Sequence, residues 1–181
     1  MKSVILDATE GNYLEEILKQ KLMECNDEVF YYKLKDKNII PCRACGGCSN
    51  IKPGLCVQKD DMQEVLKDIA KGDRIIMLTP IVFGGYSSLL KKAVDRFMVL
   101  GLPFLFIKKG KLLHPMRYGT KAIIGIGIAG EGPMGQEEGF RLVVERNALN
   151  MQAPYKALVF KTSEDRAKIE NELAIALKEV V

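Results

Sequence analysis

Short apolar runs alternate along this chain with segments whose apolar residues recur every three or four positions. A short apolar run bounded by polar residues is typical of a buried strand, and the three-to-four spacing is typical of one face of a helix. The pattern predicts strands at residues 3–6, 29–34, 74–78, 121–128 and 156–160. It predicts helices at residues 12–25, 60–70, 86–100, 136–149 and 163–180.

Five strands separated by helices indicate a parallel sheet, because parallel neighbours need a crossover connection and the crossover is usually a helix. Right-handed crossovers then give a doubly wound, three-layer α/β sheet with helices on both faces, in the strand order 2-1-3-4-5. With 181 residues and 48% apolar content, the chain fits one domain over residues 1–181 with a substantial core. Ligands of such sheets bind beyond the carboxyl ends of the strands, where the strand order reverses.

Four of the five cysteines lie in one loop of about residues 41–58, in the run PCRACGGCSNIKPGLC. These are Cys42, Cys45, Cys48 and Cys56. Their tight C-x2-C-x2-C repeat can surround one metal centre, and a similar repeat opens the cluster-binding run of bacterial ferredoxins. The fourth cysteine departs from that run, because Val57 follows it where a ferredoxin has proline. Three interpretations stay open: an iron–sulfur cluster, a four-thiolate zinc site, or reduced thiols without a metal.

The cysteine content and the N-terminal sequence argue against a secreted or membrane protein. Five cysteines in 181 residues are too few for a disulfide scaffold, and MKSVILDATE lacks the apolar region of a signal peptide. The longest uncharged stretch, residues 75–90, is interrupted by Pro80, Gly84 and Gly85 and falls short of the roughly 20 apolar residues of a spanning helix. We therefore expect a cytoplasmic protein, and the mild net charge of +4 does not suggest nucleic-acid binding.

Glycine-rich loops follow the third and fourth predicted strands. In the first, TPIVFGGYSS, Pro80 is expected to end the strand, while Gly84 and Gly85 let the backbone approach a flat ligand. The second, IAGEGPMG, begins its glycines at Gly130. Each loop alone is an ordinary strand-to-helix turn. Together at one edge of the sheet, and beside the cysteine loop, they indicate a ligand site.

Three segments resemble a known family. TPIVFGGYSSLLKKAVDRF resembles the flavin-contacting segment of flavodoxin-fold NAD(P)H-dependent FMN reductases. PCRACGGCSNIKPGLCVQKDDM resembles the cysteine loop of their iron–sulfur flavoprotein branch, and HPMRYGTKAIIGIG is similar to the stretch leading into the fourth strand of that group. The resemblance covers about residues 40–130. It implies a flavodoxin-like fold, bound FMN, reduction by NAD(P)H or ferredoxin, and a homodimer or homotetramer.

The resemblance also assigns residues to the cofactors. In cluster-bearing relatives the four cysteines bind a 4Fe-4S centre next to the flavin of a neighbouring subunit. Phe83 is an apolar neighbour for the flavin ring, while Val82 stands where relatives often have a tyrosine that offers a stacking surface. Backbone N–H groups after Pro80 can hydrogen-bond to the polar edge of the ring and favour its reduced form. The residues that the resemblance places at the flavin are Thr79, Pro80, Ile81, Val82, Phe83, Gly84, Gly85, Tyr86 and, on the opposite loop, Gly130.

The loop after the first strand departs from the family. Relatives have a Gly-Ser-Pro-Arg stretch ending in Gly-Asn-Thr, which holds the FMN phosphate, whereas this chain has DATEGNYLEEIL from Asp7. The Gly-Asn pair ending at Asn12 is kept, but Tyr13 replaces the threonine, so Thr9, Asn12 and the first N–H groups of the helix remain as donors. Asp7 and Glu10 can cancel the few tenths to about 1 kcal/mol that a helix N-terminus contributes to anion binding. We therefore expect weak phosphate contacts.

Two classes of function agree with these features. The first is an oxidoreductase in which FMN accepts a hydride from NAD(P)H and a cysteine-bound cluster exchanges single electrons with a ferredoxin-type partner. The alternative is a flavodoxin-like metal-binding or interaction module that has lost FMN, including a zinc-stabilised domain. No protein acid or base is evident, since His114 is the single histidine and lies in a basic connection.

Overall fold

The computed structural model describes residues 1–11, 13–132 and 134–180. Its central sheet contains five parallel strands in the order β2-β1-β3-β7-β8, which confirms the predicted flavodoxin-like order 2-1-3-4-5. The parallel strands are β1 (Lys2–Asp7), β2 (Glu28–Lys33), β3 (Arg74–Val82), β7 (Ala122–Ala129) and β8 (Tyr155–Lys161). A short strand, β4 (Gly85–Tyr86), pairs antiparallel with the end of β3.

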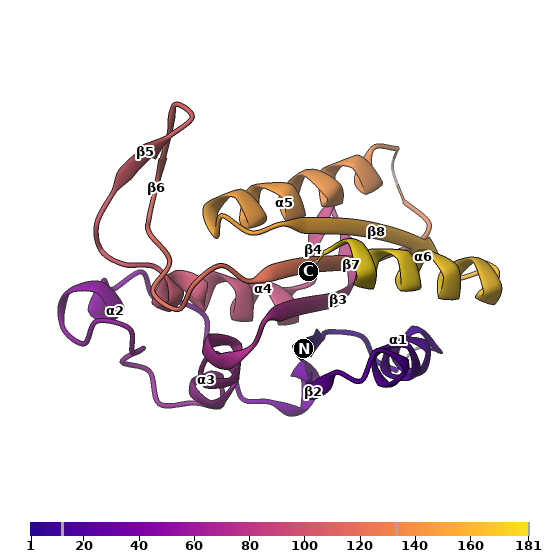
Figure 1. Cartoon of the computed structure of the whole chain (residues 1–181), viewed down its shortest axis with the longest axis horizontal. Coiled ribbons are helices and arrows are strands. Elements are labelled where there is room, and N and C mark those ends of the chain that lie inside the picture. Colours follow the sequence, from indigo (N-terminus) through magenta and orange to yellow (C-terminus); the bar gives the residue numbers. More distant parts are fainter. Residues whose placement is uncertain (12, 133, 181) are drawn as a thin grey trace.

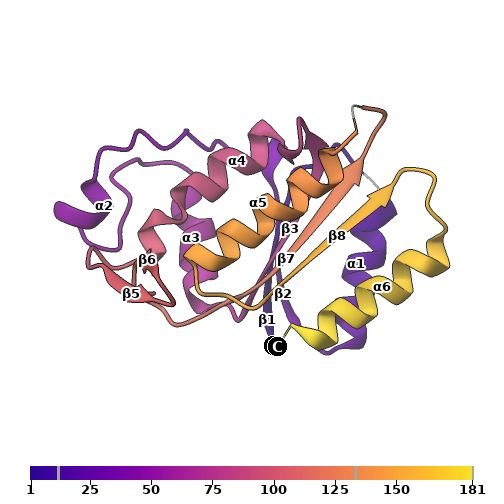
Figure 2. The same cartoon turned by 90° about the horizontal axis from the view of Figure 1, so that it is seen from above.

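Helices cover both faces of the sheet in three layers (Figures 1 and 2). One face carries α1 (Tyr13–Glu24) and α6 (Arg166–Glu179). The other carries α3 (Met62–Lys71), α4 (Ser88–Val94) and α5 (Gln136–Asn150). None of the helices in the described ranges is long and apolar enough to cross a membrane.

The spacing of apolar residues explains which helix faces are buried. In α1, the buried Leu14, Ile17, Leu18 and Leu22 recur every three or four residues and therefore form one stripe. The stripe shares a core with the inner face of α6 and with sheet residues such as Ile76. Burying one such side chain contributes about 1.5–3 kcal/mol. Packing of this stripe, rather than intrinsic helix propensity, therefore holds α1 on the sheet.

Strand β3 runs to Val82, past the predicted end at residue 78, and includes Pro80. The expectation that Pro80 ends the strand is therefore wrong. The carbonyl of Leu78 accepts the Ala8 N–H at 2.8 Å, so Leu78 faces β1, and Pro80, two residues further on, faces the same side. Because β1 has already ended at Asp7, the missing N–H of Pro80 leaves no ladder hydrogen bond unmade.

The segment predicted as one helix over residues 86–100 is divided. After α4, which Ser87 caps, the chain continues as a 3-10 helix, η2 (Asp95–Leu100). Two further short helices lie before α3: η1 (Leu34–Asp36), and α2 (Gly47–Asn50) within the cysteine loop.

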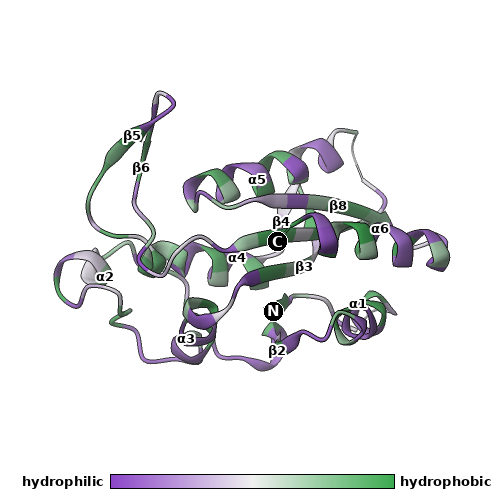
Figure 3. Cartoon of the chain, viewed as in Figure 1, coloured by the Kyte–Doolittle hydropathy of each residue, from purple (hydrophilic) through white to green (hydrophobic). Residues whose placement is uncertain are grey.

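The connection after η2 forms a hairpin arm that stands out from the body of the molecule (Figure 1). Its strands, β5 (Phe106–Lys108) and β6 (Lys111–Leu113), pair antiparallel. The arm combines apolar residues with a hydrophilic tip (Figure 3). Phe104, Ile107 and Leu112 on this arm are 67%, 75% and 63% exposed.

A buried ion pair holds the amino edge of the sheet together. Arg74 begins β3, and its guanidinium donates to the Asp27 carboxylate at 2.6 Å and to the Leu177 carbonyl at 2.7 Å. The Ser3 hydroxyl donates to the same Asp27 oxygen at 2.6 Å. Burial disfavours the Asp27 carboxylate, but the hydrogen bonds from Ser3 and Arg74 outweigh burial and hold its pKa below the usual value. This pair therefore ties β1, β3, the start of β2 and the end of α6 to one another.

Replacing Asp27 by Asn should lower the free energy of unfolding at pH 7 by about 3 kcal/mol, because Arg74 is left buried without its counter-charge. The folded-state pKa of Asp27 is lowered. Its contribution is therefore complete above the unfolded value of about 3.9 and is lost as the pH falls through the folded value. Urea unfolding as a function of pH should show the two proteins converging below about pH 4. A difference in stability between wild type and Asp27→Asn that does not change with pH would contradict this role. Asp36→Asn is the control, because Asp36 is exposed, and it should change the free energy of unfolding little at any pH.

Candidate functional site

Strands β3 and β4 form a tight hairpin at the carboxyl edge of the sheet. Val82 pairs with Gly85, so Phe83 and Gly84 make the turn. Both have positive φ, 48° and 72°, as a type I′ turn requires. Asn, Asp or Gly is usual at the position of Phe83, and a bulky side chain is strained there. Phe83 is nevertheless 95% exposed, so no packing of its ring compensates the strained backbone. Such strain points to a binding role.

Helix α5 holds this hairpin in place. A Cβ on Gly139 would lie 3.1 Å from the Gly84 oxygen, so helix and hairpin meet through two glycines. The Asn147 amide donates to the Tyr86 hydroxyl at 2.9 Å, and the Tyr86 ring meets Phe140 edge-on with centroids 5.9 Å apart. Burial raises the pKa of Tyr86 to about 12 despite the hydrogen bond from Asn147. Tyr86 therefore stays protonated at neutral pH and positions the hairpin.

The close approach of α5 depends on two glycines of β7. A Cβ on Gly125 would lie 2.5 Å from Val144, and a Cβ on Gly127 would lie 2.8 Å from Phe140. Side chains at these positions would push α5 away from the sheet, and the hairpin would lose its support. Gly125 and Gly127 therefore serve packing rather than ligand contact.

Thr79 and Ser87 close the base of the hairpin. The Thr79 hydroxyl lies 3.0 Å from the Ser87 hydroxyl and accepts the Ser87 N–H at 3.1 Å. The Ser87 hydroxyl in turn accepts the Leu90 N–H at the start of α4. Thr79 is fully buried, so its side chain joins β3 to α4 instead of reaching a ligand at the surface.

The residues predicted to contact flavin therefore divide into two groups. Thr79 and Tyr86 are buried supports, whereas Pro80 and Ile81 are half-buried on β3. Val82, Phe83 and, on the loop after β7, Gly130 are exposed, whereas Gly85 is half-buried and Gly84 is half-buried against α5.

The loop after β1 is held by hydrogen bonds to the carboxylate of Asp7. The N–H and the hydroxyl of Thr9 both donate to one oxygen of Asp7, at 2.8 and 2.7 Å. The Tyr31 hydroxyl donates to the other oxygen at 2.6 Å. Burial together with Asp7 and Glu15 raises the pKa of Tyr31, so this hydroxyl stays a donor. Thr9 is therefore directed to Asp7, and Asn12, also predicted to contact the phosphate, lies outside the described residues.

The four cysteines of the cysteine loop all line one cavity of about 740 Å³. The cavity lies between this loop, η2, β6 and the end of α5. Cys42 and Cys45 are exposed, whereas Cys48 and Cys56 are half-buried against the apolar core. Within the described ranges, no three His, Cys, Asp or Glu side chains gather closely enough to hold a metal ion. The expected convergence of the four sulfurs on one point is thus not present in this arrangement.

Arg96 joins the two ends of the cysteine loop. Its guanidinium donates to the Ile40 carbonyl at 3.1 Å and to the Asp60 carboxylate, which also accepts the N–H groups of Ile40 and Met62. Both charged side chains are buried. Burial opposes the charge of Arg96, but Asp60 and the neighbouring Cys56 outweigh burial and hold its pKa above the ordinary value. In the part of the chain that the structure describes, its Nε and Nη2 have no hydrogen-bond partner.

The cysteine cavity and the β3–β4 hairpin lie at opposite ends of α4. The hairpin leads into the start of α4, whereas η2, at the other end, contacts α2 of the cysteine loop. Figure 1 shows α2 and β4 well apart. The cavity lining contains none of the residues 79–86. The expectation that the cysteine loop lies beside the flavin segment within one chain is therefore wrong.

His114 lines the same cavity, and its ring fixes the base of the hairpin arm. Its Nδ1 lies 2.8 Å from the Leu102 carbonyl and 2.9 Å from the Phe104 carbonyl, so this nitrogen is the protonated donor. The imidazole is thus occupied by the backbone of the connection that precedes β5.

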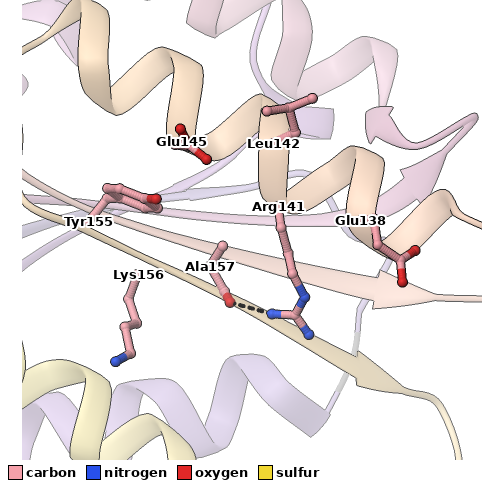
Figure 4. Close-up of a pocket in the computed structure, with 7 residues that line it drawn as sticks. All are labelled: Glu138, Arg141, Leu142, Glu145, Tyr155, Lys156 and Ala157. Atoms are coloured by element: carbon pink, nitrogen blue, oxygen red, sulfur yellow. Dashed lines mark hydrogen bonds between the residues drawn. The ribbon is translucent and has the colours of Figure 1, made fainter.

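A second hollow, of about 490 Å³, lies between α5 and the edge strand β8 (Figure 4). Arg141 reaches across it and donates to the Ala157 carbonyl at 2.7 Å. Glu138, Glu145 and Lys156 also line the hollow, and Lys156 points away from Arg141 and pairs with Glu179. The hollow opens at the amino end of β8, away from the carboxyl edge, so its position does not favour a ligand site.

The sequence analysis assigned no site role to Tyr31, to Asn147 or to the buried guanidinium of Arg96. Arg96 interrupts a stripe of apolar residues in η2, and this was a signal that its charge had to find a buried partner. Tyr31 and Asn147 gave no comparable signal, because each acts through a partner far away in the sequence, Asp7 and Tyr86.

Comparisons with known proteins agree with this geometry. The NADPH-dependent FMN reductase family matches residues 10–163. An iron–sulfur flavoprotein of Archaeoglobus fulgidus is 32% identical over 84 residues, which cover 46% of this chain and 40% of that protein. One from Methanocaldococcus jannaschii is 31% identical over 143 residues, 79% of this chain and 65% of that protein.

A solved structure shares the fold. It is an FMN-dependent NADH-azoreductase of Bacillus anthracis in complex with FMN, with a TM-score of 0.66, 13% identity and 99% of each chain covered. At this identity the likeness concerns the fold alone. The family match, in contrast, spans most of the sequence, and this chain belongs to the NADPH-dependent FMN reductase family.

Replacing Phe83 by Asn should raise the free energy of unfolding by about 0.5–1 kcal/mol, because asparagine tolerates the left-handed conformation better and no packing is lost. Urea unfolding checks this, with Phe104→Asn as the matched control, since Phe104 is also an exposed phenylalanine but has no positive φ. The control should change stability little. A loss of stability in Phe83→Asn would mean that the ring packs in the folded state.

Proposed function

We propose that this chain is an FMN-dependent oxidoreductase that accepts reducing equivalents from NAD(P)H. The observation that carries this proposal is the strained and exposed Phe83 at the carboxyl edge of β3. Strands β1 and β3 are neighbours there, and the chain order reverses at this point, which is where doubly wound sheets bind their ligands. Membership of the NADPH-dependent FMN reductase family supports the same assignment.

The hairpin suits the ring of a flavin. Phe83 and Val82 offer exposed apolar contact, and Gly84 and Gly85 place no side chain between the turn and a ligand. The backbone N–H groups of the turn can donate to the polar edge of the ring. When bound, FMN supplies two-electron acceptance from a nicotinamide and single-electron release, chemistry that protein side chains lack. The residues of this chain orient the ring, and no acid or base among them is assigned to the reaction.

We propose in addition that Cys42, Cys45, Cys48 and Cys56 hold a 4Fe-4S cluster. The four thiols line one cavity and are the donor type that such clusters require, and the cysteine loop would have to draw their sulfurs together to bind one. The unpartnered Nε and Nη2 of Arg96, beside Cys56, offer a buried positive charge to a thiolate ligand. When bound, such a cluster supplies one-electron transfer, with a ferredoxin-type protein as the electron partner.

Assembly of several chains belongs to this proposal. Because α4 separates the cysteine cavity from the hairpin, electrons would pass between cluster and flavin of different subunits in a homodimer or homotetramer. We place the protein in the cytoplasm, where a reducing environment would keep the cysteines as thiols.

Flavin titration of the assembled protein tests the flavin site. Saturable quenching of FMN fluorescence is expected, and Phe83→Asn should weaken it about tenfold, because one stacking contact of about 1 kcal/mol or more is lost. Gly85→Val should also weaken binding, since it fills space beside the ring. Phe104→Asn, at the base of the distant hairpin arm, is the matched control and should bind FMN normally. No binding by the wild type would favour the alternative function, a metal-binding or interaction module.

Metal analysis of anaerobically purified protein tests the cluster. We expect iron and sulfide with the visible absorbance of an iron–sulfur centre, and Cys45→Ser should abolish this absorbance while leaving the circular dichroism of the sheet unchanged. Cys25→Ser is the control, because Cys25 is an exposed thiol outside the cavity. Zinc in place of iron would support the structural zinc site, and absence of both metals would support bare thiols.

A further inference from the structure

The Asp7 carboxylate is held where a flavodoxin-type fold receives phosphate. Asp7 ends β1, and the next residue, Ala8, pairs with Leu78 of β3, so this loop leaves the sheet beside the hairpin. Phosphate groups in such folds are bound by the N–H groups of this loop and by the N-terminus of the helix that follows. In this chain that helix is α1.

Both donors of Thr9 are already used within the chain. The N–H and the hydroxyl of Thr9 both donate to Asp7, and Tyr31 donates from β2. Asp7 is 0% exposed and Thr9 is 4% exposed, so this set of hydrogen bonds is sealed from solvent. Asp7 thus stands as an internal anion bonded to the groups that would otherwise bind an external one.

Charge around the loop also opposes a second anion. Residues 8–18 contain no lysine or arginine, and Glu15 and Glu16 lie in the first turn of α1. Two nearby lysines, Lys19 and Lys33, are both engaged with Glu15, at 2.7 and 3.7 Å. Glu16 therefore adds a carboxylate at the positive end of the α1 dipole, while the two lysines are already paired with Glu15.

Tyr13 stands where relatives have a threonine, and its hydroxyl is buried without a hydrogen-bond partner among the described residues. Its ring packs against the core shared by α1 and α6, so the side chain points into the protein and not toward a ligand. Burial and the charge of Glu164 raise its pKa, which keeps it a neutral phenol. The Thr9 hydroxyl is thus already bonded to Asp7, and the Tyr13 hydroxyl lies buried, so neither is offered at the surface to a phosphate dianion.

We infer that the flavin site of this chain does not recognise the phosphate of FMN and therefore binds riboflavin with about the same affinity as FMN. Asp7 is the residue that sets this specificity. The inference rests on the proposed function, because it concerns the same flavin site. Recognition falls to the ring, through the β3–β4 hairpin.

Parallel titrations of the flavin-free protein with FMN and with riboflavin test this inference. For the wild type, the two dissociation constants should agree within about threefold, and raising the salt concentration from about 0.05 to 0.5 M should not weaken FMN binding, because no attractive phosphate contact is screened. Glu10→Lys places a positive charge on the exposed loop. It should tighten FMN binding by about three- to tenfold and leave riboflavin unchanged. Glu28→Lys, an exposed charge change at the opposite edge of the sheet, should alter neither.

A second variant tests Asp7 itself. Asp7→Asn keeps the shape of the side chain and removes its charge, and it should favour FMN over riboflavin by about three- to tenfold relative to the wild type. If this variant does not fold, the Glu10→Lys titrations and the salt dependence of FMN binding by the wild type test the inference. Wild-type FMN binding more than about thirtyfold tighter than riboflavin binding, and weakened by salt, overturns the inference but leaves the proposed function standing. Failure of both flavins to bind overturns the proposed function.

Discussion

The position of β3 between β1 and β7 is the constraint on which the rest of this structure depends. Residue-by-residue pairing on both sides fixes its register, and the strand outruns β1 by several residues. The extra length carries the β3–β4 hairpin beyond the sheet. Two glycines in the neighbouring β7 then let α5 approach closely enough to support it. A strained turn is maintained because packing on one side and strand pairing on the other leave it no relaxed alternative.

Two buried arginines each connect separate segments of the chain through an ion pair and hydrogen bonds. Arg74 joins strands and helices at the amino edge, and Arg96 joins the two ends of the cysteine loop. Each lies in a buried ion pair, but the two differ in what remains unsatisfied. Arg74 reaches Asp27, Ser3 and Leu177, whereas Arg96 keeps two nitrogens without a partner among the described residues. The Arg74 ion pair serves the fold alone. The Arg96 ion pair leaves two N–H donors unused beside Cys56 in the described part of the chain.

The sequence was sufficient for the sheet but not for the site. Strand order followed from apolar runs and crossover handedness, because both act locally along the chain. The continuation of β3 through Pro80 could not be predicted, since it depends on where β1 ends in space. The exposure of Phe83 and the burial of Thr79 depend likewise on contacts with α5 and α4. The acidic first loop was visible as a departure from the family, yet its hydrogen bonds to Tyr31 required the pairing of β1 with β2.

The self-contained loop at Asp7 has a kinetic consequence. A loop that waits for its ligand is ordered when the ligand arrives, and the entropy lost in that step weakens and slows association. Here the ordering takes place during folding, because the carboxylate that organises the loop is covalently part of it. A flavin would thus meet a surface that is already formed, and its capture would depend on how often the ring collides with the hairpin in the right orientation.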